Sequence, residues 1–304
     1  MPNKSTALRF APLALIAVAL VWGGAFVVMK PAVDVQPIVD FLGTRFVIAA
    51  GVMIAARPSV LKKMRGPVVW QGLALGTLMA IAYYTQTVGL QLTTAAISGF
   101  VTGLYVVISP LLIWLFMRVR ITGKIWIAVG LATIGLAFIS INPSSLSFEW
   151  PQLWLVACAF FFSLHIAGLA RWSPGQDAYT LTVIQLGVVG LINMVWAGVR
   201  GYHPPMGGYG WFAILFTAIF STAIAFFVQT WAQGVMDSSR VAIYLTSETL
   251  FAALIAVAVG QEVLKLQTVV GGGLILVAML VVEWPSRAGN RAQNIVLPVE
   301  NLPH

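Results

Sequence analysis

Ten apolar stretches, each about long enough to cross a lipid bilayer, follow one another between Phe10 and Trp284. A membrane-spanning helix needs roughly 20 apolar residues to cover about 30 Å of hydrocarbon. Only helices and closed barrels satisfy their backbone hydrogen bonds there, and these stretches are continuous rather than alternating. Charged residues make up only 9% of the chain, which leaves too little polar surface for a soluble domain. The sequence therefore predicts an all-α polytopic membrane protein.

The expected spans are joined by short connections, many of which contain proline or glycine. A chain of 304 residues then has no room for a separate catalytic domain. The polar tail at 285–304 is expected to be disordered. The ten spans cover approximately residues 10–30, 37–56, 67–89, 95–117, 123–141, 150–171, 178–199, 210–233, 240–260 and 266–284.

Lysine and arginine are unevenly divided between the two sides of the predicted membrane. With the N-terminus placed inside, 13 of the 17 lie in inner segments, three (Lys30, Arg200 and Lys265) in outer segments, and Arg45 within a helix. Basic residues concentrate in cytoplasmic loops, so we expect both termini in the cytoplasm. The same bias accounts for the net charge of +8, and we predict no nucleic-acid partner.

The second half of the chain repeats the order of features in the first half. Residues 83–87 (YYTQT) in the third span have a counterpart in residues 226–230 (FFVQT) in the eighth, 143 residues later. Five spans per copy is an odd number, so the second copy enters the membrane upside down. Inverted repeats that enclose a shared midplane site recur in secondary transporters. We therefore expect two five-helix repeats, 10–141 and 150–284, although a repeat without alternating access remains an alternative.

Several short motifs resemble the EamA unit of the drug/metabolite transporter superfamily. They are Val21-Trp22-Gly23-Gly24-Ala25-Phe26, the Gly89–Ala96 tract, Tyr244-Leu245-Thr246-Ser247-Glu248-Thr249 and Gly260-Gln261-Glu262. The chain departs from the usual pattern at Thr249, where proline is common, and its first copy keeps Pro110 without a preceding acidic residue. Overall, the chain looks most like the YddG-type exporters.

The resemblance implies a transporter in the bacterial inner membrane. It would export aromatic or neutral amino acids, or related small metabolites, by alternating access without ATP. The alternatives are an exporter of another metabolite or drug, a membrane enzyme that acts on lipid, and a channel or scaffold. The sequence leaves the exact cargo, the coupling ion and the oligomeric state open.

Two charged residues lie inside predicted spans, where an uncompensated charge costs about 2.5–3.5 kcal/mol on insertion scales. Arg45 is near the middle of the second span and Glu248 near the middle of the ninth. One interpretation is a buried Arg45–Glu248 pair that fixes helix packing, or an arginine that reaches toward Asp40. The other is that Glu248 binds a substrate amine or a proton and Arg45 binds a carboxylate.

Aromatic and amide side chains are the remaining candidates for the cavity wall. Adjacent residues on a helix point about 100° apart, so one aromatic of each repeated pair can face inward. These aromatic rings could instead face lipid or serve only in packing, and His165 could simply bond to a neighbouring helix. Pro110 is a candidate hinge in the fourth span, although it could equally produce a static kink. The substrate-binding candidates are Trp22, Tyr83, Tyr84, Gln86, Tyr105, His165, Phe227, Gln229, Tyr244 and Glu248.

The sequence contains no motif for ATP-driven or hydrolytic chemistry. It has no Walker-type loop, no His-Glu-X-X-His and no Gly-X-Ser-X-Gly. Three histidines and no acidic cluster argue against a metal site, and Cys158 is expected to be a small buried residue. We therefore predict a protein that is not an enzyme, needs no cofactor or metal, and interacts with lipid and a small-molecule substrate.

Overall fold

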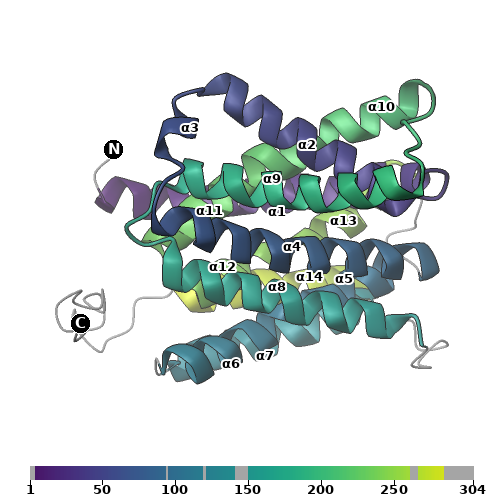
Figure 1. Ribbon diagram of the computed structural model, residues 1–304. Coiled ribbons are helices and arrows are strands. Elements are labelled where there is room, and N and C mark those ends of the chain that lie inside the picture. The colour runs from purple at the N-terminus through teal and green to yellow at the C-terminus, as the bar shows by residue number, and fades with distance from the viewer. Residues whose placement is uncertain (1–3, 94, 119–120, 141–149, 261–265, 284–304) are drawn as a thin grey trace.

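The computed structural model describes residues 4–93, 95–118, 121–140, 150–260 and 266–283. Within these ranges every regular element is helical, which confirms the predicted all-α class. Figure 1 shows the helices side by side in one bundle. The short helix α3 (Val60–Lys63) lies at one end of the bundle, and α10 (Gly207–Phe216) begins at the other end. We call these ends the α3 side and the α10 side.

Six helices in the described part of the chain are long and apolar enough to cross a membrane. The last of the six is continuous over Gly207–Val235, because α10 passes through the π-helix η2 (Thr217–Ile224) into α11 (Ala225–Val235). The other five are α1 (Lys4–Val33), α2 (Ile38–Ala56), α4 (Pro67–Leu92), α8 (Gln152–Trp172) and α9 (Ala178–Arg200).

The other four expected spans correspond to shorter helices, so the count of ten remains a prediction. The spans predicted at 95–117 and 240–260 each consist of two helices. The full set is α5 (Ala95–Gly103), α6 (Tyr105–Met117), α7 (Gly123–Ser140), α12 (Ser238–Leu245), α13 (Ser247–Ala258) and α14 (Leu266–Glu283).

Helices from the two halves of the chain pack against each other throughout the bundle. The most extensive contacts join α2 with α9, α7 with α14, α4 with both α8 and α9, and α1 with α13. Glycines allow this close approach. A Cβ atom at Gly23 of α1 would lie 2.6 Å from the backbone nitrogen of Ala252 in α13. At Gly135 of α7 it would lie 2.6 Å from the carbonyl oxygen of Gly271 in α14.

In the part of the bundle that the structure describes, three places depart from regular α-helix. Leu104 separates α5 from α6, and Thr246 separates α12 from α13. The third place is η2, where π-type bonding shifts the helical register and redirects side chains. Irregular backbone inside a membrane bundle is tolerated where it is buried in protein or lines a cavity. A ligand-binding site is therefore expected near these three places.

Candidate functional site

A cavity lies among the helices that carry the three irregular places. Residues on both sides of each helix break contribute to it, as does the π-helix. The aromatic wall is Trp22, Phe26, Tyr83, Tyr105 and Phe162; the polar and charged residues are Arg45, Gln86, Thr102, Ser221, Gln229 and Glu248; the aliphatic ones are Ala25, Met29, Ile166 and Leu245.

Three pairs of cavity residues are related by one spacing in the sequence. Gln86 and Gln229, Thr102 and Leu245, and Tyr105 and Glu248 are each 143 residues apart. The same spacing relates Tyr83 to Phe226, whose rings meet edge to face with centroids 5.9 Å apart. Equivalent positions of the two repeated motifs therefore meet around one cavity.

Arg45 is 2% exposed, and side chains of two other helices accept its hydrogen bonds. Its Nε donates to Thr222 Oγ1 at 2.7 Å and its Nη2 to Ser221 Oγ at 2.9 Å. Its Nη1 faces the Met29 sulfur at 3.5 Å. Both hydroxyls come from the π-helix η2, so the irregular segment presents two consecutive acceptors to one guanidinium group.

Aromatic rings complete the environment of Arg45. The guanidinium carbon lies 5.1 Å from the ring centroid of Tyr83 and 5.3 Å from that of Phe46, within the range of cation–π attraction. The indole nitrogen of Trp22 donates to the carbonyl oxygen of Ser221 at 2.8 Å and so anchors the π-helix to α1. The protein itself therefore solvates this buried cation.

Glu248, in the first turn of α13, has a different environment. Among the described residues it forms no ion pair, with Arg45 or with any other cation, and no hydrogen bond. The hydroxyl of Tyr105 and the Oε1 atom of Gln229, which line the same cavity, are buried and have no hydrogen-bond partner in the described structure. The cavity thus holds several acceptors that have no donor in the described structure.

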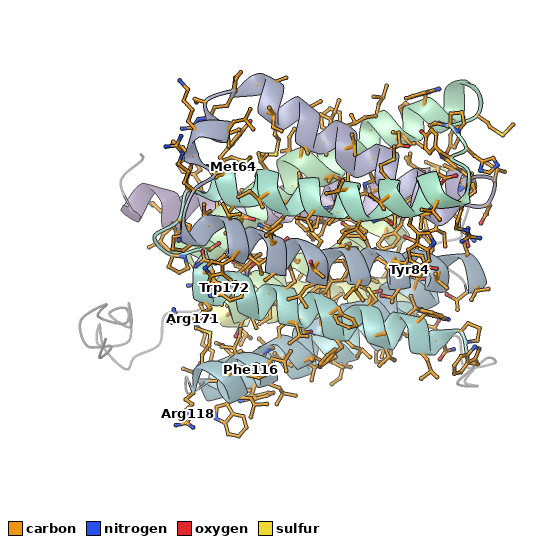
Figure 2. All side chains as sticks on the ribbon, in the orientation of Figure 1. Met64, Tyr84, Phe116, Arg118, Arg171 and Trp172 are labelled. Carbon is orange, nitrogen blue, oxygen red and sulfur yellow. The ribbon has the colours of Figure 1, made fainter. Side chains whose placement is uncertain are left out.

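The second aromatic of each repeated pair points away from the cavity. Tyr84 stacks on Trp196 with ring centroids 5.2 Å apart, and Figure 2 places it on α4 toward the α10 side. Phe227 packs against Tyr179 at 5.5 Å. The angle between neighbouring helix positions explains why Tyr83 faces inward while Tyr84 does not.

Three further candidates from the sequence are buried but do not line the cavity. His165 is fully buried behind the wall, and its Nε2 lies 2.7 Å from Oε1 of Gln185 on α9. Tyr244 is 4% exposed within α12. Pro110 lies inside α6, which continues through it; the helix breaks at Leu104 instead.

Sequence reasoning missed several residues that the structure brings to the site. Ser221 and Thr222 form a polar pair inside a strongly apolar span, and this pair was the available signal. Phe162 and Thr102 belong to no motif, and no sequence signal distinguishes them from packing residues.

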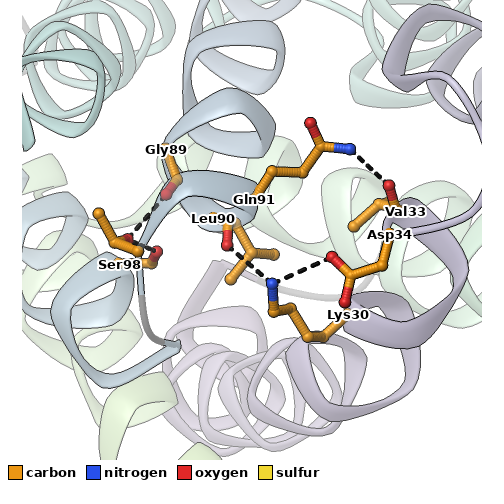
Figure 3. A network of polar contacts seen from close by, with 8 residues as sticks. Lys30, Val33, Asp34, Gly89, Leu90, Gln91 and Ser98 are labelled. Atoms are coloured by element: carbon orange, nitrogen blue, oxygen red, sulfur yellow. Dashed lines mark hydrogen bonds and ion pairs between the residues drawn. The ribbon is translucent and has the colours of Figure 1, made fainter. Parts of the chain in front are cut away.

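Side chains at the α10 side fasten α1 to α4. The Lys30 ammonium donates to the carbonyl oxygen of Leu90 at 3.2 Å and pairs with Asp34 at 3.1 Å. The amide of Gln91 donates to the carbonyl oxygen of Val33. Figure 3 shows these contacts joining the two helix ends.

Toward the α3 side, a similar set of contacts fastens α8 to α11. The Ser173 hydroxyl donates to the carbonyl oxygen of Thr230 at 3.0 Å. The Gln233 amide donates to the carbonyl oxygen of Ile166 at 3.1 Å and to the Ser238 hydroxyl at 3.0 Å. Polar side chains thus bind backbone carbonyls at both ends of the bundle.

An aspartate at the start of α9 holds the chain that follows α2. Asp177 accepts hydrogen bonds from Thr180 at 2.8 Å and from Lys63 at 3.2 Å, and Arg57 lies 3.8 Å away. Burial alone would raise the pKa of Asp177. The bonds from Thr180 and Lys63 and the charge of Arg57 outweigh burial and hold this pKa below its usual value.

An aspartate at the start of α2 holds the chain that follows α9 in the same way. The Asp40 carboxylate accepts from the backbone N–H of His203 at 2.9 Å, and the ring Nδ1 of His203 is 3.3 Å away. Gln36 donates to the His203 carbonyl oxygen at 3.0 Å. Asp40 is therefore engaged at the α10 side and is not a partner of Arg45.

Comparison with known proteins gives concordant results. The sequence profile described as the EamA-like transporter family matches residues 9–141 and again 149–284. Two uncharacterized transporters of Archaeoglobus fulgidus are similar: one is 31% identical and covers 90% of this chain and 85% of its own length, and the other is 25% identical with 86% and 94% covered. A protein of known crystal structure shares the fold with a TM-score of 0.75 at 18% identity, covering 90% of this chain and 96% of that one.

Proposed function

This chain belongs to the EamA-like transporter family, and we propose that it is a secondary carrier that exports aromatic or neutral amino acids, or related small metabolites, across the bacterial inner membrane. It is a multi-pass membrane transporter. The proposal adds the cargo, the direction and the mechanism to that family assignment.

The observation that carries the proposal is the composition of the cavity. Aromatic side chains supply a wall for an apolar or aromatic side chain of the cargo. Gln86 and Gln229 offer amide donors and acceptors, and Glu248 adds a single carboxylate. This set suits a small molecule with an apolar part and a polar amine-bearing end, as in an amino acid.

We further propose ten spans arranged as two inverted repeats, 10–141 and 150–284, that move by alternating access. The common 143-residue spacing of cavity pairs and the contact between Tyr83 and Phe226 support the repeat. The polar contacts that fasten α1 to α4 at one end and α8 to α11 toward the other support two gates, one for each side of the membrane.

The α3 side is proposed to face the cytoplasm. Arg118 and Arg171, labelled in Figure 2, lie at that side together with Arg57 and Lys63. Basic residues near span ends are retained in the cytoplasm. Both termini would then be cytoplasmic, because each half of the chain holds five predicted spans.

Reconstitution of the purified protein into liposomes tests the proposal. Vesicles preloaded with unlabelled phenylalanine or leucine should take up the labelled compound faster than empty vesicles, and the rate should saturate with concentration. Protein-free liposomes and a Leu115→Ala variant, altered at a 59% exposed apolar position, serve as controls. Flux that neither saturates nor shows counterflow would indicate a channel, and turnover of a lipid substrate would indicate an enzyme.

A further inference from the structure

Arg45 and Glu248, the two charged residues of the cavity, differ in whether their polar atoms already have protein partners. A carboxylate binds arginine most strongly in a bidentate manner, through two parallel N–H groups. The Nε and Nη2 atoms of Arg45 form one such edge, and the hydroxyls of Thr222 and Ser221 already occupy it. The third nitrogen, Nη1, faces the sulfur of Met29. Each of the three guanidinium nitrogens of Arg45 therefore has a protein partner, and none of these partners is a carboxylate.

Three other residues of the cavity have acceptor atoms for which the described structure provides no donor. Buried polar atoms in native proteins are almost always hydrogen-bonded, and an exception indicates a missing partner. Tyr105 is 6% exposed and Gln229 is 3% exposed, and neither the Tyr105 hydroxyl nor Gln229 Oε1 has a partner in the described structure. Glu248 adds a carboxylate that has no cation partner among the described residues. The three side chains line the same cavity and come from three different helices, α6, α11 and α13.

We propose that Glu248, Tyr105 and Gln229 form a subsite for one primary ammonium group, and that the cargo needs no carboxylate to bind. An ammonium has three N–H donors and no acceptor, which matches a carboxylate, a hydroxyl oxygen and an amide oxygen. The aromatic side chain of Trp22 lines the same cavity and favours a cation further. Arg45 is a positioning residue, which holds η2 against α2.

The first repeat does not contain a second copy of this subsite. Glu248 in the second repeat corresponds to Tyr105 in the first, and Gln229 corresponds to Gln86. The acidic group is present in only one of the two equivalent positions. The cavity therefore takes one ammonium group, and a cargo with a second cationic end has no equivalent partner.

Three matched compounds test this inference, which rests on the proposed function only for the choice of probes. Phenylalanine carries both charged groups, phenethylamine lacks the carboxylate, and 3-phenylpropionate lacks the amine. Each is titrated against the purified full-length protein in detergent, and the rise in melting temperature is recorded as a measure of binding. We expect phenylalanine and phenethylamine to stabilise the protein at similar concentrations, and 3-phenylpropionate to have no effect. Stabilisation by the acid but not the amine, or by none of the three, overturns the subsite.

Three variants test whether phenethylamine binds at the proposed subsite. Tyr105→Phe should weaken phenethylamine binding about threefold and Glu248→Gln about tenfold or more, because a charge-assisted bond is stronger than a neutral one. Tyr84→Phe makes the same chemical change on a ring that stacks against Trp196 outside the cavity, and it should leave binding unchanged. Equal effects of Tyr105→Phe and Tyr84→Phe would overturn the assignment. The three-compound comparison on the unaltered protein stands even if a variant does not fold.

The counterflow assay separates this inference from the proposed function. Amino-acid counterflow without any stabilisation by phenethylamine removes the ammonium subsite and leaves the carrier. Stabilisation by phenethylamine without amino-acid counterflow supports the subsite and contradicts the proposal that amino acids are the cargo.

Discussion

Arg45 and Glu248 lie on the walls of one cavity, yet the protein treats the two charges in opposite ways. The guanidinium of Arg45 has hydroxyl, sulfur and aromatic partners within the bundle, whereas the carboxylate of Glu248 has no partner among the described residues. A charge inside the membrane is costly in either case. From this difference in partners we infer that Arg45 holds the fold, and we propose that Glu248 is available to a ligand.

The largest expected effect is loss of stability on Arg45→Ala. The substitution leaves a cavity and removes the hydrogen bonds to Thr222 and Ser221, so the free energy of unfolding should fall by about 3 kcal/mol. Thermal unfolding in detergent measures it. If Arg45→Ala unfolds like the unaltered protein, Arg45 does not hold η2 in place.

Glu248→Gln should reduce transport without destabilising the protein. Removing a partly buried charge that has no partner among the described residues should raise the free energy of unfolding by about 1 kcal/mol. Counterflow of an amine-bearing cargo should fall about tenfold or more, because a charge-assisted bond is lost. Both quantities are measured on one preparation. A variant that is less stable and still transports normally would remove the contrast with Arg45.

Thr222→Val tests whether the π-helix is held by the arginine. It keeps the shape of the side chain but removes the acceptor of the Arg45 Nε bond, and about 1–2 kcal/mol of stability should be lost. Thr77→Val is the matched control, because Thr77 is exposed and bonds only to the carbonyl oxygen of Leu73 in its own helix. Equal melting temperatures for the two variants would contradict the assigned role.

The smallest effect is expected outside the membrane, at Asp177, a charge that has partners as Arg45 does. Partly exposed ion pairs contribute about 0.5–1 kcal/mol, so Asp177→Asn should lower stability by that amount at neutral pH. The pKa of Asp177 is lower in the folded protein than in the unfolded chain. Its contribution is therefore complete above the unfolded value, about pH 4, and disappears as the pH falls through the lowered value. Unfolding measured from pH 7 to pH 3 should show the two proteins converge in acid, and a difference that persists there would contradict the ion pairs.

The sequence by itself determined the class of the protein and the relation between its halves. Continuous apolar stretches require helices in lipid, and the 143-residue spacing that links 83–87 to 226–230 also links the cavity pairs. These are properties of local composition and order along the chain. They identify Gln86, Tyr105, Gln229 and Glu248 as candidates without knowledge of how the helices pack.

Only the tertiary structure decided which of those side chains meet and which charge has partners. Arg45 bonds residues 176 and 177 positions away, and the π-helix that presents them shifts the register that a regular helix would have. A shift of one residue turns a side chain by about 100°, enough to move a hydroxyl from the lipid to the cavity. The local pattern specifies that a helix forms, but rotation and contact arise from packing between distant segments.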